Sequence, residues 1–299
     1  MKIGIIDFDT SHAVAFTQRL NHIDIAQEQW VEGGTITVGC PGESLLSPER
    51  IPEFTEQMRQ YGVPLVDQPE EIIGQVEAVM VESVDGSVHL DRARAFIEAG
   101  LPTYIDKPFA CSLADARQLA DLAASHQVPI FSSSSLRYAP EVVSALTQTD
   151  QIGNFIGVEV STPASQHPRN PGLFHYGIHG VEMLYTLMGP GCQAAWSVSN
   201  EDVDLVTGLW QDGRVGTVRG IRRGNAGFGF TIYGEKQILR SAVSATFIYR
   251  ELLKQIVQMF QTGQSPLLIS ETLEVVAFIE AANTSAEHDG QRIPLADTN

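Results

Sequence analysis

One lysine stands out among the side chains that could carry out chemistry. The chain has only four lysines, and Lys107 lies between Asp106 and Pro108, directly after the apolar run PTYI. Such a run is typical of a short buried strand. Because open α/β sheets bind ligands at the carboxyl ends of their parallel strands, Lys107 is predicted to lie at a ligand site. The alternative is a surface lysine in a loop. The bond between Lys107 and Pro108 is a candidate for cis geometry, since X-Pro bonds adopt it at little cost.

A second polar group occurs in the segment FHYGIHGVE. His175, His179 and Glu182 fall one helical turn apart, so they would share one face of a helix that begins before His175. Imidazole and carboxylate groups in this pattern could bind zinc or manganese. Gly177 and Gly180 weaken the start of such a helix, and a substrate-binding role explains the same residues. We therefore expect no bound metal and keep these three residues as the alternative metal site.

Acidic residues occupy the turn that follows the first apolar run, KIGII. A phosphate-binding turn normally reads G-x-G-x-x-G, and here its glycine places hold Asp7, Asp9 and His12. Two carboxylates within about 4 Å of a pyrophosphate would cost roughly a few kcal/mol unless they point away. Thr10, Ser11 and the backbone amides that start the next helix could still form an anion site. Alternatively, Asp9 only caps that helix.

The first half of the chain alternates apolar strand runs with helical patterns, which predicts a parallel sheet with right-handed crossovers. After the second strand, TITVG, Cys40 stands where an acid usually binds the adenosine ribose. Expected strands cover residues 2–6, 35–39, 76–82, 102–105 and 128–131, and expected helices cover residues 13–20, 48–61, 89–99, 112–125 and 137–146.

From about Gly153 the pattern changes to alternating stretches separated by turns, which predicts an antiparallel sheet. The expected strands are 204–210, 216–221 and 228–234, and the expected helices are 178–188, 249–261 and 270–286. The predicted class is α/β, with a Rossmann-type doubly wound parallel sheet over residues 1–130. An α+β domain with a mainly antiparallel open sheet is expected over residues 131–299. The closing helix is expected to pack against the first domain.

Composition excludes several classes of protein. The formal net charge of -17 disfavours nucleic-acid binding, because phosphates require a basic surface. Arg219, Arg222 and Arg223 could still hold an anionic group, although a solvated strand edge explains them equally well. No stretch is long and apolar enough to span a membrane, and the N-terminus lacks an export-signal pattern. Three cysteines outside any paired pattern fit a reducing cytoplasm.

Several segments together resemble the Gfo/Idh/MocA family, which includes glucose-fructose oxidoreductase and inositol dehydrogenase. TYIDKPFACSLADARQLADLA resembles the family's hallmark strand ending in Glu-Lys-Pro, with Asp106 in the place of glutamate. A family segment in which a strand leads to a loop ending in histidine and then to a helix resembles VEAVMVESVDGSVHLDRARAFIEAGLP, where His89 holds the position of that histidine. SSSSLRYAP resembles a segment with an Arg-aromatic pair, here Arg137 and Tyr138.

The second half also resembles this family. GLFHYGIHGVEMLYTLMG is similar to a motif with Asp, His and Asp at positions i, i+4 and i+7. His179 keeps the central place, while His175 and Glu182 stand where aspartates are usual. FTIYGEKQIL and the closing segment from Thr262 resemble the family's sheet and last helix, so the resemblance spans nearly the whole chain.

The resemblance implies an NAD- or NADP-dependent oxidoreductase that acts on a CH-OH group of a sugar, inositol or related compound. In such an oxidation a hydride moves to the nicotinamide while a base, suitably a histidine, takes the hydroxyl proton. The resemblance places Lys107, His179 and His175 in catalysis. It also implies cofactor contacts from Asp7, Asp9, Thr10, Ser11, His12, Ser83, His89, Asp106 and Pro108, and substrate contacts from Arg137, Tyr138, His175 and Glu182.

Two other classes of function remain open, because a fold does not settle a function. One is a non-redox enzyme, metal-assisted or cofactor-free, that uses Asp7, Asp9, His12, His175 and His179. The other is a non-catalytic ligand-binding subunit. The resemblance further implies a homodimer or homotetramer with a small-molecule substrate, and no nucleic acid or membrane as partner.

Overall fold

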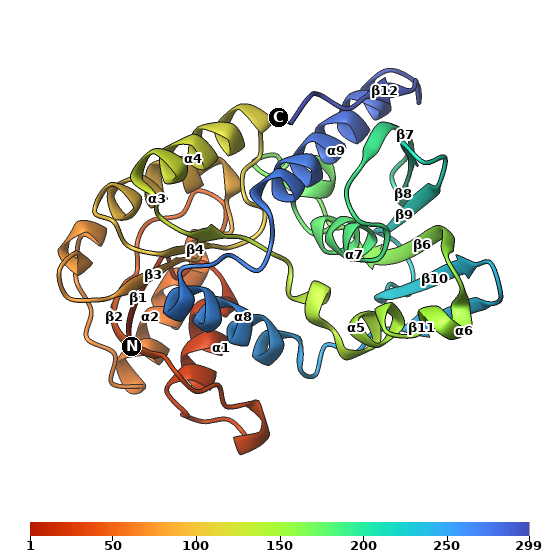
Figure 1. Ribbon diagram of the computed structural model, residues 1–299. Helices are drawn as coiled ribbons and strands as arrows, with labels where there is room; N and C mark the ends of the chain where they lie inside the picture. The colour runs from red at the N-terminus through yellow and green to blue at the C-terminus, as the bar shows by residue number, and fades with distance from the viewer. Residues whose placement is uncertain (299) are drawn as a thin grey trace. The chain divides into compact units, whose positions relative to one another are not determined.

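The computed structural model describes residues 1–298, which form two compact units (Figure 1). The N-terminal unit comprises Met1–Ala110, Ala114–Ser133 and Tyr249–Ile269. The C-terminal unit comprises Cys111–Leu113, Ser134–Ile248 and the chain from Ser270 onward. The expected boundary between the two domains was after residue 130, whereas the chain passes into the C-terminal unit at Ser134. In addition, the segment Tyr249–Ile269 belongs to the N-terminal unit.

The N-terminal unit is built on a five-stranded sheet with strand order β2-β1-β3-β4-β5, and every pairing in it is parallel. Its strands are β1 (Lys2–Ile6), β2 (Thr35–Cys40), β3 (Ala78–Val81), β4 (Thr103–Ile105) and β5 (Ile130–Phe131). β3 and β4 are buried along their whole length, as expected for parallel strands covered on both faces. The predicted Rossmann-type sheet is confirmed.

Helices of the N-terminal unit follow the predicted alternation closely. They are α1 (Ser11–Leu20), α2 (Ile51–Gln60), α3 (His89–Glu98), α4 (Leu113–His126) and α8 (Ile248–Thr262). The late helix α8 lies beside α1 (Figure 1), where the Tyr249 ring is 5.5 Å from that of Phe16 and 5.4 Å from the Arg19 guanidinium carbon. These contacts explain why Tyr249–Ile269 belongs to the first unit.

The C-terminal unit contains a seven-stranded sheet with strand order β11-β10-β6-β9-β8-β7-β12. Its strands are β6 (Phe155–Pro163), β7 (Cys192–Ser199), β8 (Val203–Trp210), β9 (Val215–Ile221), β10 (Gly229–Gly234), β11 (Ile238–Ala242) and β12 (Ile293–Pro294). The pair β6 and β9 is parallel, whereas the other pairings between these strands are antiparallel. The prediction of a mainly antiparallel sheet is confirmed.

Four helices accompany this second sheet: α5 (Pro140–Leu146), α6 (Thr149–Ile152), α7 (Ile178–Met188) and α9 (Ile269–Glu287). α7 packs against β6 and β9. Aromatic rings join α7, β8 and α9, since the Phe278 ring lies 5.7 Å from Tyr185 and 6.5 Å from Trp210. The core of the unit therefore lies between α7, α9 and one face of the sheet.

Short 3₁₀ turns connect several elements, and two of them change a prediction. They are η1 (Gln27–Gln29), η2 (Pro48–Arg50), η3 (Pro69–Ile72), η4 (Gly86–Val88), η5 (Ser135–Tyr138) and η6 (Gly172–Phe174). The helix expected over 137–146 is divided into η5 and α5. The reason is Pro140, which disfavours helical geometry at Ala139, where φ is -58° and ψ is 133°.

The second change concerns the residues before α7. His175 follows η6, and the α-helix begins only at Ile178. The prediction that His175, His179 and Glu182 share one helical face is therefore wrong. Within residues 1–298, none of the helices combines the length and apolar composition that crossing a membrane requires.

Candidate functional site

Five ionisable side chains gather at the carboxyl ends of β1, β3 and β4, which are neighbours in the parallel sheet. We call Asp7, Asp9, His12, Glu82 and Asp106 the sheet-edge cluster. All five are buried, with exposed fractions of 6% or less. A concentration of buried ionisable groups at this edge marks a candidate functional site, because proteins rarely bury charge without a use for it.

Asp7 adopts a backbone geometry that is more typical of glycine. Its φ of 66° lies in the left-handed region, which Gly, Asn and Asp adopt most readily. Its Oδ2 accepts a hydrogen bond from the Ser83 hydroxyl and lies 3.4 Å from Arg92 Nε. Burial raises the pKa of Asp7 from 3.8 to about 6, although Arg92 opposes the shift. The turn therefore has a left-handed residue at Asp7 and encloses a weakly acidic carboxyl group.

Asp9 is turned toward the segments that follow β2 and β3. Its carboxylate accepts hydrogen bonds from the Ser44 hydroxyl at 2.6 Å and from the Val84 amide at 3.0 Å. Burial raises the pKa of Asp9, and those two hydrogen bonds oppose the shift. The N-cap of α1 is Thr10, whose side chain accepts from the His12 amide at 3.2 Å. The alternative in which Asp9 caps this helix is therefore wrong.

Substituting Asp7 by Asn should stabilise the protein above pH 6. Because the pKa is raised, the folded protein keeps a proton between about pH 4 and pH 6 that the unfolded chain releases, so stability falls as pH rises through this window. The cost at pH 8 is about 3 kcal/mol at most. We expect Asp7→Asn to raise the free energy of urea unfolding at pH 8 by about 1–3 kcal/mol, with little effect at pH 4.

The control is Asp121→Asn, which removes an exposed carboxylate of α4. It should leave the difference in stability between pH 4 and pH 8 unchanged. An Asp7→Asn protein whose stability retains the full wild-type dependence on pH would show that Asp7 is ionised in the folded state throughout this range.

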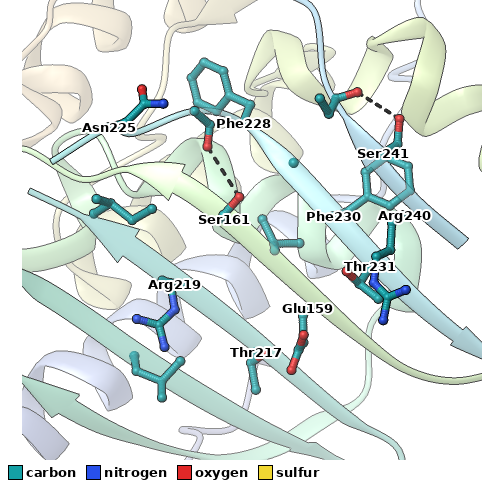
Figure 2. A pocket seen from close by; sticks show the side chains of 16 residues that line it. Glu159, Ser161, Thr217, Arg219, Asn225, Phe228, Phe230, Thr231, Arg240 and Ser241 are labelled. Carbon is teal, nitrogen blue, oxygen red and sulfur yellow. Dashed lines mark hydrogen bonds between the residues drawn. The ribbon is translucent and has the colours of Figure 1, made fainter. Parts of the chain in front are cut away.

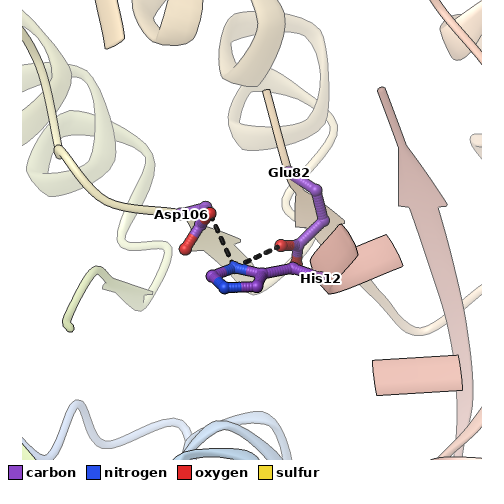
Figure 3. Close-up of side chains that lie close together, drawn as sticks. All are labelled: His12, Glu82 and Asp106. Atoms are coloured by element: carbon purple, nitrogen blue, oxygen red, sulfur yellow. Dashed lines mark hydrogen bonds and ion pairs between the residues drawn. The ribbon is translucent and has the colours of Figure 1, made fainter. Parts of the chain in front are cut away.

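His12 bridges two acids of the sheet-edge cluster (Figure 3). Its Nδ1 lies 2.8 Å from Asp106 Oδ2 and 3.8 Å from Glu82 Oε2. The imidazole ring is stacked on Phe16 at 4.8 Å and meets the edge of Tyr249 at 4.9 Å. Aromatic packing and the acid contact together fix the ring, so Nδ1 is directed at the carboxylates.

Asp106 stays ionised in spite of its burial. Burial raises its pKa, but the neighbouring His12 and Lys107 outweigh this and lower the pKa well below its usual range. Lys107 Nζ lies 3.6 Å from Asp106 Oδ2, and the Tyr104 hydroxyl donates to Oδ1 at 3.3 Å. The peptide bond between Lys107 and Pro108 is cis. Lys107 thus follows β4 with its ammonium group beside a fixed negative charge.

Glu82 belongs to this cluster although sequence reasoning did not select it. It is fully buried, and within the described part of the chain neither carboxylate oxygen has a hydrogen-bond partner. Burial, together with the charge of Asp106, raises its pKa well above the usual value. One feature of the sequence does point to Glu82: it is an acidic residue that directly follows a buried apolar strand, at the end where such sheets bind ligands.

His89 connects the loops that follow β3 and β4. Its Nε2 lies 2.8 Å from the Ser83 carbonyl oxygen and its Nδ1 lies 3.3 Å from the Phe109 carbonyl oxygen. Both ring nitrogens therefore face backbone acceptors, and the ring is completely buried. His89 thus hydrogen-bonds the protein itself, and Ser83 lies between His89 and Asp7.

In the C-terminal unit a second polar group surrounds the start of α7. We call Ser134, Arg137, His179, Glu182 and Glu271 the α7 cluster. Arg137 Nε donates to Glu182, and its Nη1 donates to Glu271 Oε1 at 2.6 Å. Burial lowers the pKa of Arg137, but the two carboxylates outweigh it and raise the pKa above its usual value. Arg137 and Glu182, predicted as substrate contacts, therefore neutralise each other.

His179 is held by a hydroxyl and by aromatic rings. Its Nδ1 lies 2.7 Å from Ser134 Oγ, which also accepts from the Leu136 amide. The Tyr176 ring meets the imidazole edge-on at 4.9 Å, and Phe228 does so at 6.0 Å. Tyr138, the other member of the Arg-aromatic pair, is half-buried on η5. The contact between Ser134 and His179 could not be predicted from a sequence pattern, apart from the presence of the serine run 132–135.

The alternative metal site is not assembled. The His175 ring lies 5.8 Å from that of His167, and Glu182 is held by Arg137. Among residues 1–298, the group of three metal-ligating side chains with donor atoms within 4.8 Å of one another is His12, Glu82 and Asp106.

The arginine run does not form an anion site. Arg222 donates to Asp204, and Arg223 Nη1 lies 3.6 Å from Asp202 Oδ1. Arg219 lies apart from them on the sheet face. Two of the three positive charges are therefore balanced by neighbouring carboxylates.

In a comparison with known protein families, the segment that contains the loops after β3 and β4 matches a family model. Residues 46–134 match the GFO_IDH_MocA model, described as an oxidoreductase family with an NAD-binding Rossmann fold. Over these residues the chain is similar to the Gfo/Idh/MocA family. The resemblance expected from the sequence is confirmed. The matched segment includes Ser83, His89, Asp106 and Lys107, whereas the turn with Asp7 and Asp9 precedes it.

One curated relative and many solved structures are also similar to this chain. The Salmonella typhimurium protein YceM, which is named as an oxidoreductase, is 30% identical over 116 residues, or 39% of this chain and 37% of YceM. The aligned part therefore spans little more than a third of that relative.

The structural neighbours show that the fold extends over the whole chain. GenD2 from gentamicin A biosynthesis, solved with NAD, superposes with a TM-score of 0.81 at 17% identity, covering 99% of this chain and 97% of GenD2. Myo-inositol 2-dehydrogenase from Lactobacillus plantarum gives 0.81 at 13% identity, covering 99% of each chain. Scyllo-inositol dehydrogenase from Lactobacillus casei, solved with NAD(H) and scyllo-inositol, gives 0.80 at 14% identity and 99% of each chain. At these identities the likeness concerns the fold.

Proposed function

We propose that this protein is an NAD(P)-dependent oxidoreductase that transfers a hydride between a nicotinamide cofactor and a hydroxylated small molecule. The observation that carries the proposal is Lys107, which follows β4 beside Asp106 at the carboxyl edge of a parallel sheet. This edge is where open α/β sheets bind ligands, and the segment matches an NAD-binding family. We further propose that the N-terminal unit binds the dinucleotide and that the C-terminal unit binds the substrate.

The turn after β1 is compatible with a dinucleotide despite its two acids. Asp7 keeps a glycine-type backbone, and both carboxylates are hydrogen-bonded to protein donors. Their raised pKa values reduce the negative charge that a pyrophosphate would meet. Thr10, Ser11 and the first amides of α1 would then hold the phosphates, since a helix N-terminus favours anions.

We propose a separate role for each predicted catalytic residue, as the family resemblance implies. A bound nicotinamide would supply the hydride acceptor or donor. We propose that Lys107 orients the substrate hydroxyl and stabilises the negative charge that develops on its oxygen. His179 would take the hydroxyl proton, with Ser134 fixing the orientation of its ring. Since inositol dehydrogenases are among the structural neighbours, we propose a sugar or polyol as the substrate class.

Calorimetric titration of metal-stripped protein with NAD⁺, NADH, NADP⁺ and NADPH tests this function. Micromolar binding of one pair is expected, followed by reduction of that nucleotide in a screen of polyols. Absence of binding by all four nucleotides would exclude the oxidoreductase and favour a non-redox enzyme or a ligand-binding subunit.

We also propose a homo-oligomer in the cytoplasm, where the three free cysteines would stay reduced. A groove of about 730 Å³ lies on the exposed face of the second sheet, with Glu159, Arg219 and Phe230 among its lining residues (Figure 2). This face combines apolar and charged groups, as interfaces between copies commonly do. Sedimentation should show a dimer or tetramer, and a species of 32.6 kDa alone would contradict this.

A further inference from the structure

We infer that His12, Glu82 and Asp106 form a binding site for one divalent transition-metal ion, Mn²⁺ or Zn²⁺, at the edge of the parallel sheet. Neither the family match nor the dinucleotide proposal requires such an ion. The inference depends on the sheet-edge cluster alone, so it can be tested independently of the proposed oxidoreductase function.

The three donors come from separate segments that the fold brings together (Figure 3). His12 lies in the first turn of α1, Glu82 follows β3 and Asp106 follows β4. Because β1, β3 and β4 are adjacent in the sheet, the segments that follow them meet at one edge. All three donor residues belong to the N-terminal unit, which supplies the site by itself.

Glu82 gives the strongest indication that a cation belongs here. A buried polar group normally has a hydrogen-bond partner, and an unpaired buried carboxylate is especially costly. Glu82 is completely buried, yet neither of its oxygens accepts a hydrogen bond from the described residues. Its Oε2 lies 3.8 Å from His12 Nδ1. A metal ion would satisfy this carboxylate directly.

The spacing of the donor atoms suits a small ion. His12 Nδ1 is 2.8 Å from Asp106 Oδ2 and 3.8 Å from Glu82 Oε2, and all three donors lie within 4.8 Å of one another. Ligands bound at about 2.0–2.2 Å in tetrahedral geometry are separated by roughly 3.3–3.6 Å. The His12–Asp106 pair is closer than this separation and the His12–Glu82 pair is slightly farther, so the donor spacing brackets the value that one ion requires.

The donor types and the surrounding charge select the kind of ion. One imidazole nitrogen with two carboxylates suits manganese or zinc better than calcium, which prefers six to eight oxygens. Asp7 and Asp9 are two further buried acids of the same sheet-edge cluster. Lys107 opposes cation binding, because its Nζ is 3.6 Å from Asp106 Oδ2. With more acids than bases around it, the site favours a divalent cation.

The experiment uses full-length protein freed of metal with EDTA and then dialysed. Mn²⁺ is titrated while the free aqueous ion is followed by electron paramagnetic resonance, and Zn²⁺ is titrated calorimetrically. We expect one equivalent of either ion to bind with micromolar affinity. The bound ion should also raise the thermal midpoint, because it stabilises only the folded state. No nucleotide is present, so the result does not depend on oxidoreductase activity.

Glu82→Gln is the decisive variant, since it keeps the shape of the side chain and removes its charge. It should fold at least as stably as the metal-free wild type and bind Mn²⁺ about 100-fold more weakly. His12→Gln is the second variant, with the same expected loss. Asp204→Asn, which changes a buried acid of the C-terminal unit, is the matched control and should bind like the wild type.

Two outcomes would overturn the inference. The first is a metal-free wild type that binds neither ion at millimolar concentration, because Glu82 would then simply hold a proton. The second is a Glu82→Gln protein that binds Mn²⁺ as tightly as the wild type, because the ion would then lie elsewhere. NAD(H) titration of the same metal-stripped samples separates either result from a failure of the dinucleotide proposal.

Discussion

Arg137→Leu should lower the free energy of unfolding by about 3–5 kcal/mol. The guanidinium group is buried and donates to both Glu182 and Glu271. Leucine would leave two carboxylates next to each other without the positive charge that balances them. Removing one partner of a buried ion pair is strongly destabilising for this reason. Urea unfolding at pH 7, followed by circular dichroism, measures the change.

The matched control is Arg223→Leu, which removes an exposed arginine 3.6 Å from Asp202 and should change stability by less than about 0.5 kcal/mol. The triple variant Arg137→Leu, Glu182→Leu and Glu271→Met should recover much of the loss, because it removes all three charges together. A loss below about 1 kcal/mol for Arg137→Leu alone would mean that the three side chains are well solvated.

Lys107→Ala should lower kcat/KM for the polyol that the wild type oxidises best by about 1000-fold. The ammonium group is proposed to act on the substrate hydroxyl, and its charge matters most when the oxygen becomes negative. Because the loss concerns the transition state, kcat should fall more than KM rises. The Kd for the nicotinamide cofactor should change by less than about tenfold, since other groups hold the phosphates. Steady-state kinetics and calorimetry provide the two readouts.

Lys254→Ala is the control for a general loss of positive charge, because Lys254 lies on the exposed side of α8 and contacts Glu251. Its kcat/KM should equal that of the wild type. If Lys107→Ala retained more than about a tenth of the wild-type kcat/KM, then Lys107 would be only a structural partner of Asp106.

The sequence alone determined the order of strands and helices in the first half. In the second half it predicted β8, β9, β10 and the helices α7, α8 and α9, but not the strands β6, β7, β11 and β12. Parallel strands are buried on both faces, so their apolar runs are continuous and easily recognised. Helix α7 begins and ends where its pattern predicted, at Ile178 and Met188. The position of Lys107 at a strand end also followed from sequence, because the run PTYI and the following proline define where β4 stops.

Local interactions between neighbouring residues were harder to predict, because several side chains compete for the same role. Thr10, one residue later in the chain, caps α1 in place of Asp9, whose carboxylate reaches Ser44 and Val84 instead. Pro140 stops a helix that the apolar pattern extended back to residue 137. In both cases the sequence pattern correctly predicted a helix. The side-chain contacts of Asp9 and the steric effect of Pro140 then changed the residue at which that helix begins.

The charged clusters were decided by tertiary structure alone. His12, Glu82 and Asp106 are separated by tens of residues and meet only because β1, β3 and β4 are neighbours in the sheet. Arg137 and Glu271 lie 134 residues apart and meet because η5 and α9 pack in one unit. Periodicity reports which face of an element is buried. It does not report which buried charges face one another, since that depends on strand order and on packing between elements far apart in the chain.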